Sequence, residues 1–194
     1  GARLSRKTLC DWVLAACELL GALRGPLHQH ILGAPVIFGD DTTLRLIAEG
    51  LARDRCVTAR LWGYVSAGAV CDEDGNWQPY PKAVLYEFTR DRRGEHPQRI
   101  LEHYRGYLQA DDYAGYHALF KSGRVLHAAC WAHARRPFFD LDRASPAGTG
   151  PPGLARQALD WIGGLYKIKR EVRECAPDIR EAQRRERTRP LLKA

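Results

Sequence analysis

The chain has 194 residues, of which 45% are hydrophobic, and its formal net charge is +7. This length can bury a hydrophobic core and fits one domain with an appendage. Because no stretch approaches the roughly 20 uninterrupted apolar residues of a membrane span, and the first residues carry no signal-peptide pattern, the sequence excludes a membrane protein and predicts a soluble, cytoplasmic one.

The first predicted element is an amphipathic helix. Ser5 fits an N-cap, apolar residues recur at helical spacing as far as Leu23, and Gly25 followed by Pro26 is expected to stop the run. We expect the helix to dock on another part of the protein through its one apolar face.

From residue 35 to about residue 90 the pattern changes to that of strands. Three segments rich in β-branched and aromatic residues predict successive strands, with turn residues 72–76 between the last two. The segments are 35–40, 61–70 and 83–89.

After Gly94 helical and strand patterns alternate, which implies a partly parallel sheet. Pro137 is expected near the first turn of its helix or as a kink. The predicted elements are a helix at 97–105, a strand at 107–111, a helix at 113–121, a strand at 125–130, a helix at 132–141, a mobile loop at 144–153 and a helix at 154–175.

The positive charge is concentrated at the C-terminal end. Residues 154–194 hold eleven Lys or Arg and six Asp or Glu, a net charge of +5. A basic surface of this kind favours a polyanion, with nucleic acid as the first candidate, although a solvated helix face is the alternative.

The six cysteines are scattered without a C-x-x-C pair, so reduced thiols are favoured over a disulfide framework or a zinc ribbon. Cys130 and His133 stand at metal-ligand spacing but supply only half of a tetrahedral zinc site. The chain contains no methionine, so we expect a piece of a longer protein or a processed product.

Two aspartates stand where predicted strands end. Asp40 follows the apolar run 35–39, and Asp111 follows the run 106–110. Carboxylates at the ends of neighbouring strands make a site for a divalent metal ion, whereas the alternative for each is a turn or helix-cap carboxylate. Asp112, which precedes Tyr113, is predicted to be an N-cap.

Five segments resemble the DDE transposases of insertion sequence 66, and together they run over nearly the whole chain. These are residues 4–12, 39–42, 93–97, 108–116 and 130–139. The resemblance implies an α/β, ribonuclease-H-like fold, in which a mixed sheet is flanked by helices, with an N-terminal helix and a basic helical C-terminal stretch.

The resemblance also implies a catalytic role for both aspartates, with Asp40 and Asp111 as the first two carboxylates and as ligands of Mg²⁺ or Mn²⁺. The family's third carboxylate, a Glu after an Asn-Asn pair, has no counterpart here, so the chain alone is expected to be inactive or nearly so. Smaller departures are Asp41 for Glu, Asp112 for Gly, Thr43 for Pro and Pro137 for a basic residue.

Three residues after a predicted strand are candidates for DNA contact. His133, Arg135 and Arg136 would sit at a helix N-terminus, where they could grip a phosphate or orient a metal-bound water. The alternative is a surface cluster that pairs with Asp140 or Asp142.

The predicted organisation is a helical segment at 1–34, a catalytic core at 35–143, a loop at 144–153 and an incomplete basic segment at 154–194. The predicted function is metal-dependent strand cleavage and strand transfer at insertion-sequence ends, in the cytoplasm at the nucleoid. Predicted partners are DNA (element ends and target), other transposase copies and accessory proteins. The alternatives are a non-catalytic DNA-binding or oligomerising remnant and a structure-selective nuclease on the same fold.

Overall fold

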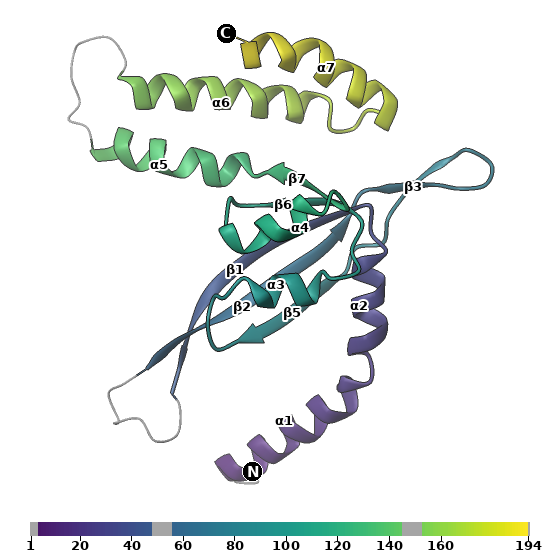
Figure 1. The fold of residues 1–194 in the computed structure, drawn as a ribbon, viewed down its shortest axis with the longest axis vertical. Helices are drawn as coiled ribbons and strands as arrows, with labels where there is room; N and C mark the ends of the chain where they lie inside the picture. Colours follow the sequence, from purple (N-terminus) through teal and green to yellow (C-terminus); the bar gives the residue numbers. More distant parts are fainter. Residues whose placement is uncertain (1–3, 48–55, 145–152, 194) are drawn as a thin grey trace. The chain divides into compact units, whose positions relative to one another are not determined.

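A computed structural model of the chain describes residues 4–47, 56–144 and 153–193. The chain divides into two compact units, residues 1–128 and 129–194, and each is described by itself below (Figure 1). Most of the predicted loop at 144–153 lies outside the described residues. None of the described helices is long and apolar enough to cross a membrane.

The first unit opens with two helices instead of the one that the sequence predicted. Helix α1 (Arg6–Gly21) begins at Ser5, whose Oγ accepts a hydrogen bond from the Thr8 amide at 3.1 Å, as an N-cap does. Helix α2 (Arg24–Leu32) follows, so the predicted stop at Gly25 and Pro26 is wrong. Proline lacks an amide hydrogen, but the first turn of a helix needs none, and Pro26 lies in the first turn of α2. None of the described residues of α1 is buried.

A five-stranded mixed sheet forms the centre of the first unit and has the strand order β5-β2-β1-β6-β7. Strand β1 pairs antiparallel with β2 and parallel with β6, and β2 pairs antiparallel with β5. This mixed sheet, with helices against it, agrees with the ribonuclease-H-like class that the sequence predicted. The strands are β1 (Val36–Leu46), β2 (Val57–Ala67), β5 (Val84–Thr89), β6 (Gly106–Ala110) and β7 (Val125–Ala129).

Strand β1 is longer than predicted and passes through Asp40 instead of ending there. Its antiparallel pairing with β2 continues to Leu46, because Thr42, Thr43 and Leu44 keep the strand composition and stay in register with β2. The parallel pairing with β6 stops earlier, at Phe38 and Gln109. Asp40 therefore lies just beyond the end of the parallel ladder and not at the end of a strand.

A small hairpin interrupts the region that the sequence assigned to one long strand. Gly68 adopts a φ of +103°, which only glycine takes readily, and separates β2 from β3 (Ala69–Cys71). Strand β3 pairs with β4 (Trp77–Pro79) around the predicted turn, where an Asp72 carboxylate oxygen accepts from the Asn76 amide at 2.7 Å. The predicted turn at 72–76 is confirmed.

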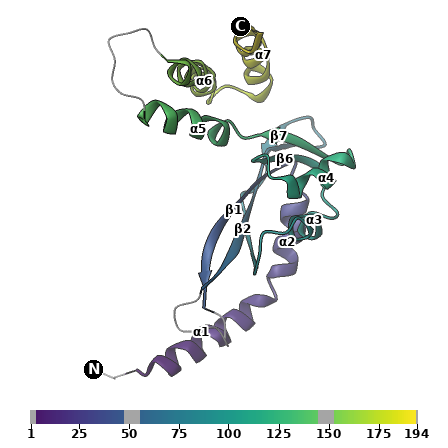
Figure 2. The same ribbon diagram turned by 60° about the vertical axis from the view of Figure 1, so that its left-hand side comes forward.

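Helices cover one face of the sheet in the first unit, and the core lies between the two layers (Figure 2). These helices are α2, α3 (Glu95–Ile100), the 3-10 turn η1 (Ala114–Tyr116) and α4 (His117–Lys121). The core side chains alternate along the strands, as the period of two requires. Its largest fully buried members are Trp62, Tyr64, Tyr104, Tyr116, Ile31, Ile37, Leu101 and Leu108.

The second unit consists of three helices, α5 (Trp131–Ala144), α6 (Leu154–Glu171) and α7 (Pro177–Lys193). Helix α5 continues through Pro137, which lies beyond its first turn, so of the two expectations for this residue the first-turn position is wrong. Trp131 of α5 meets Trp161 of α6 edge to face, with ring centroids 5.4 Å apart. The Trp161 indole donates to the Leu191 carbonyl of α7 at 2.6 Å, so one side chain joins all three helices.

The contact between α3 and η1 gives a testable prediction. A Cβ at Gly94 would lie 2.8 Å from the Gly115 Cα, so Gly94→Ala forces backbone apart and is expected to lower the free energy of unfolding of the first unit by about 1–3 kcal/mol. Gly25→Ala is the control, because a Cβ at Gly25 in α2 has no atom within 4 Å. Hydrogen exchange of the β1 amides measures both effects, and equal protection in the two variants would contradict the prediction.

Candidate active site

The parallel ladder between β1 and β6 ends two residues before each of the two predicted catalytic aspartates. Ile37 pairs with Leu108 and Phe38 with Gln109, so Asp40 and Asp111 each follow the last pair by two positions. The two residues are 71 positions apart in the sequence. Both therefore follow the carboxyl end of the parallel ladder, and ligands commonly bind at this end of α/β sheets.

Asp40 and its neighbour Asp41 point to opposite faces of the sheet. Asp41 shares the core face with Ile37 and Gly39, and only 2% of its side chain is exposed. Asp40 shares the other face with Phe38 and is exposed. The alternation of a strand thus separates a buried carboxylate from an accessible one.

Two arginines neutralise the buried Asp41 carboxylate. Arg60 of β2 donates to Asp41 Oδ2 at 2.9 Å, and Arg92, after β5, donates to Asp41 Oδ1 at 2.8 Å through Nη2 and at 3.1 Å through Nε. Burial lowers the pKa of Arg92, but the hydrogen bond and the charge of Asp41 outweigh this effect and raise it above its ordinary value. Asp41 is therefore committed to a structural ion pair.

Arg92 also connects this ion pair to the second predicted aspartate. Its Nη2 lies 3.4 Å from Asp111 Oδ2, and the Tyr113 ring lies against its guanidinium, with Cζ 4.2 Å from the ring centroid. The Tyr113 hydroxyl donates to the Arg92 carbonyl, so one tyrosine holds both ends of the residue. A guanidinium fixed in this way holds the carboxylate of Asp111 near the end of β6.

Asp111 also serves as a turn carboxylate. Its Oδ1 accepts from the Tyr113 amide at 3.2 Å, at the start of η1. The predicted N-cap role of Asp112 is therefore wrong, since Asp112 is turned outward, with a side chain 89% exposed and 3.4 Å from His117. A carboxylate has about four lone-pair sites, so the contacts with Tyr113 and Arg92 leave each Asp111 oxygen able to accept once more.

The charges of all three carboxylates affect the pKa of a buried tyrosine, Tyr116. Burial raises the pKa of Tyr116, and the negative charges of Asp111, Asp41 and Asp40 raise it further. A Cβ at Gly39 would lie 3.3 Å from the Tyr116 hydroxyl and 3.2 Å from Leu108, so glycine is needed beside Asp40 for this ring to pack. The three acids thus share one electrostatic environment at this end of the sheet.

The predicted DNA-contacting residues lie in the first two turns of α5, in the second unit. His133 and Arg135 are half-buried and Arg136 is exposed. The Arg135 guanidinium lies over the Phe139 ring, 5.2 Å from its centroid. Asp142, one of the acids considered as their partner, instead binds Arg156 at 3.2 Å.

The donor set for a metal ion consists of carboxylates. Among residues 4–47, 56–144 and 153–193, no group of three or more His, Cys, Asp and Glu side chains could hold an ion. Asp40 and Asp111 supply carboxylate oxygens, which are the ligand type of Mg²⁺, a hard cation that usually takes one or two protein carboxylates and keeps several waters. They do not make a closed cage for Zn²⁺, which needs four ligands.

Sequence reasoning missed the residues that organise the site. Arg60, Arg92 and Tyr113 carry no motif that marks them as partners of an aspartate. Their roles arise from pairings between segments 19 and 51 residues apart in sequence. The available signals were the position of Arg92, directly before the segment 93–97, and that of Tyr113, within the segment 108–116, since both segments resemble the transposase family.

The mixed sheet of order β5-β2-β1-β6-β7, with helices against it, is that of a ribonuclease-H-like protein. The family model of the IS66 transposase family matches residues 1–194, so the chain belongs to that family. It is 36% identical over 204 residues to the uncharacterized protein y4hP of Sinorhizobium fredii (strain NBRC 101917 / NGR234), covering 99% of this chain and 35% of that protein.

Two further proteins of the same strain are similar. The uncharacterized protein y4jD is 32% identical over 200 residues, covering 100% of this chain and 37% of that protein. The uncharacterized protein y4qI is 27% identical over 202 residues, covering 99% of this chain and 35% of that protein. The chain thus spans about a third of the length of the curated relatives it matches.

The two adjacent aspartates are expected to respond differently to the same substitution. Asp41→Asn leaves Arg60 and Arg92 without their anion and should lower the free energy of unfolding by about 2 kcal/mol, below the usual cost of breaking a buried pair because both arginines reach solvent. Asp40→Asn, on the exposed face, should change it by less than about 0.5 kcal/mol. Hydrogen exchange of the β1 and β2 amides compares them, and equal losses would refute the assignment of separate roles.

Proposed function

We propose that this chain contributes two of the catalytic carboxylates of a transposase that cleaves DNA at the ends of an insertion sequence and joins the cut ends to a target. The single observation that carries the proposal is the β1–β6 register, because both aspartates follow its last pair by two positions and Asp40 is exposed. Membership in the IS66 transposase family supports the assignment of DNA as substrate.

In this proposal Asp40 and Asp111 hold Mg²⁺, for which Mn²⁺ can substitute. The cation supplies charge neutralisation at the scissile phosphate and activation of the attacking oxygen. Asp41 has no part in binding it, because Arg60 and Arg92 already occupy its two oxygens. Arg92 contacts Asp111 at Oδ2, while the Tyr113 amide donates to Asp111 Oδ1, so the two contacts together orient this carboxylate.

The proposed substrate-binding residues of the second unit are His133, Arg135 and Arg136. Their placement at the start of α5 is that of residues that grip phosphate oxygens with guanidinium and backbone donors. Other copies of the transposase, accessory proteins of the element and association with the nucleoid belong to the same proposal. The domain boundaries predicted from the sequence also stay a prediction.

The alternative is a non-catalytic module that binds DNA or oligomerises. One observation favours it, namely that no cluster of three potential metal ligands exists among the described residues. In this case the two aspartates act only as turn and strand-edge carboxylates, as the Asp111 contact with Tyr113 illustrates. A nuclease that cuts branched DNA without strand transfer is a further variant of the catalytic proposal.

The catalytic proposal predicts a strict requirement for both aspartates. In a protein that contains this chain within the length of its relatives, Asp40→Asn and Asp111→Asn should each reduce Mg²⁺-dependent cleavage of labelled end DNA about 10³-fold or more, because metal catalysis contributes several kcal/mol. Asp112→Asn is the matched control next to Asp111 and should keep activity, since its side chain is 89% exposed.

The products separate the three functions. Cleaved and joined DNA indicates a transposase, cleavage of branched DNA without joining indicates a nuclease, and binding without cleavage in either Mg²⁺ or Mn²⁺ indicates the non-catalytic module. Full activity of the Asp40→Asn protein would overturn the metal assignment. Broadening of NMR signals near Asp40 by Mn²⁺, measured on the 194-residue chain, gives a second readout that does not depend on activity.

A further inference from the structure

Helices α6 and α7 of the second unit form a hairpin with one buried side and a charged exterior. The buried side of α6 consists of Leu159, Ile162, Leu165 and Ile168, which recur at helical spacing. Helix α7 has no buried residue and is attached by polar contacts, namely the Trp161 bond to Leu191 and an ion pair between Glu171 and Arg187. The outward-facing positions of the two helices therefore need no apolar side chains for packing.

A hollow between these helices is lined by cations. Its lining residues are Tyr166, Lys169, Arg170, Arg173, Arg180 and Arg184, and we name this hollow the α6–α7 groove. No acidic residue belongs to this lining. Five positively charged side chains thus line this groove, and Tyr166 is the one uncharged residue of the lining.

Glu171 and Glu181 form their ion pairs with cations outside the groove, although the Arg187 hydrogen bond is joined by the charge of Arg170 in lowering the pKa of Glu171. Glu181 binds Arg185 at 3.2 Å, and Glu171 binds Arg187. Within the described residues, Lys169, Arg170, Arg180 and Arg184 form no ion pair, and Arg173 approaches only the 93% exposed Glu174, at 3.6 Å. The excess of charge is therefore local to the groove and not an average over the helices.

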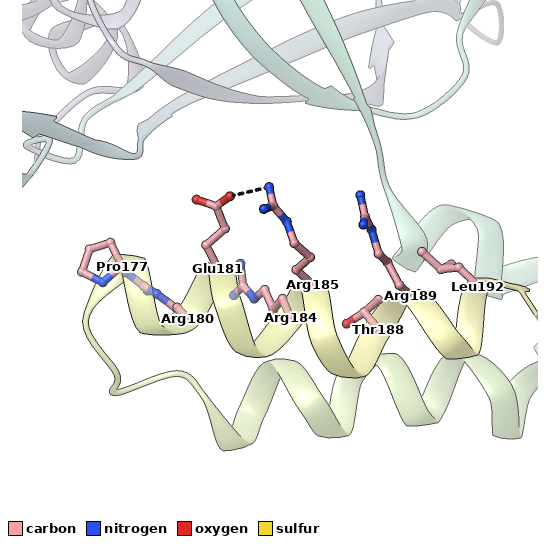
Figure 3. Close-up of a pocket in the computed structure, with 8 residues that line it drawn as sticks. All are labelled: Pro177, Arg180, Glu181, Arg184, Arg185, Thr188, Arg189 and Leu192. Atoms are coloured by element: carbon pink, nitrogen blue, oxygen red, sulfur yellow. Dashed lines mark hydrogen bonds and ion pairs between the residues drawn. The ribbon is translucent and has the colours of Figure 1, made fainter.

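The cations continue onto the outer side of α7. Arg180 and Arg184 also line a second hollow along this helix, which adds Arg185 and Arg189 (Figure 3). Figure 3 shows Glu181, Arg185 and Arg189 projecting from one side of the helix, with Glu181 turned to Arg185. The positive surface therefore extends along α7 from Arg180 to Arg189 as a band, which is the shape that a linear polyanion requires.

The chemistry of the groove is that of phosphate recognition. Like charges gathered without acids raise the local potential and attract anions. Four of the five cations are arginines, whose planar fork matches two phosphate oxygens, whereas a carboxylate ligand of low charge would leave most of them unpaired. Arg180 and Arg184 stand one helical turn apart, about 6 Å along the axis, so both reach one backbone strand.

We propose that the α6–α7 groove binds the phosphate backbone of duplex DNA without regard to sequence. The duplex is chosen because the chain belongs to a transposase family and because the band exceeds the length of a single phosphate group. This inference uses the DNA substrate of the proposed function but not its metal-dependent chemistry. The groove holds DNA, while the aspartates of the first unit act on it.

The test measures binding of the 194-residue chain to a short labelled duplex in EDTA, over a series of salt concentrations. Five phosphate contacts predict a slope of log affinity against log salt of about −4.5. The double variant Arg180→Gln/Arg184→Gln should reduce the magnitude of this slope by about 2 and weaken binding equally for unrelated sequences. Circular dichroism verifies that this double variant, and the control variant described next, keep their helices.

The matched control is the double variant Arg156→Gln/Arg187→Gln. It removes the same amount of charge from the hairpin, one arginine from α6 and one from α7, but Arg156 and Arg187 are already paired with Asp142 and Glu171. Its salt slope should stay within experimental error of the unmodified chain. Equal losses of affinity in the two double variants would show that binding depends on net charge and not on the groove.

Other ligands give separate outcomes. Tighter binding of single-stranded DNA, RNA or heparin than of the duplex, at equal charge, would overturn the duplex assignment. Because EDTA removes divalent cations, a failure of the catalytic proposal leaves this binding unchanged. Loss of binding in the groove variant together with normal Mn²⁺ broadening near Asp40 would likewise support the groove, whether or not the metal site is catalytic.

Discussion

The buried carboxylate of Asp41 is the constraint on which the first unit depends. Removing a carboxylate from water costs several kcal/mol unless cations and hydrogen bonds replace the lost hydration. Arg60 and Arg92 provide this replacement, and they come from β2 and from the segment after β5. The ion pair therefore forms only when three segments of the chain adopt their native arrangement, and it fixes the position from which Arg92 reaches Asp111.

The same arrangement explains why two adjacent acids have different roles. A strand turns successive side chains to opposite faces, so a core position for Asp41 places Asp40 on the outer face. The pairing of β1 with both β2 and β6 prevents a slip of register, which would exchange the two residues. The accessibility of Asp40 is thus a consequence of the burial of Asp41, and the tight packing of Gly39 against Tyr116 holds this arrangement in place.

Periodicity predicted the element types well, because apolar alternation and helical spacing are local properties of the sequence. It placed strands at 35–40 and 107–111, and the turn at 72–76, close to where they occur. It failed where pairing decides the outcome. The extension of β1 to Leu46 depends on β2, and the start of α2 at Arg24 depends on the tolerance of a first turn for Pro26.

The site was predictable in its acids but not in its cations. Asp40 and Asp111 follow apolar runs and stand in segments that resemble a known family, so sequence alone pointed to them. Arg92 stands between two other arginines, Arg90 and Arg93, and only the folded chain distinguishes it from them. Asp112 was predicted to be an N-cap, whereas Asp111 makes the turn contact before η1, because the exact start of η1 cannot be read from a run of two aspartates.

The distances around Arg92 suggest how the ion pair and the proposed metal site coexist. Arg92 makes its short bond, of 2.8 Å, to Asp41, and its contact with Asp111 is the longer one, at 3.4 Å. A divalent cation that approaches Asp111 competes with the guanidinium for that carboxylate, and the longer contact is the weaker one to displace. Arg92 would then remain bound to Asp41 and against Tyr113. In the proposed site the buried pair would therefore keep this end of the sheet intact while Asp111 exchanges Arg92 for the cation.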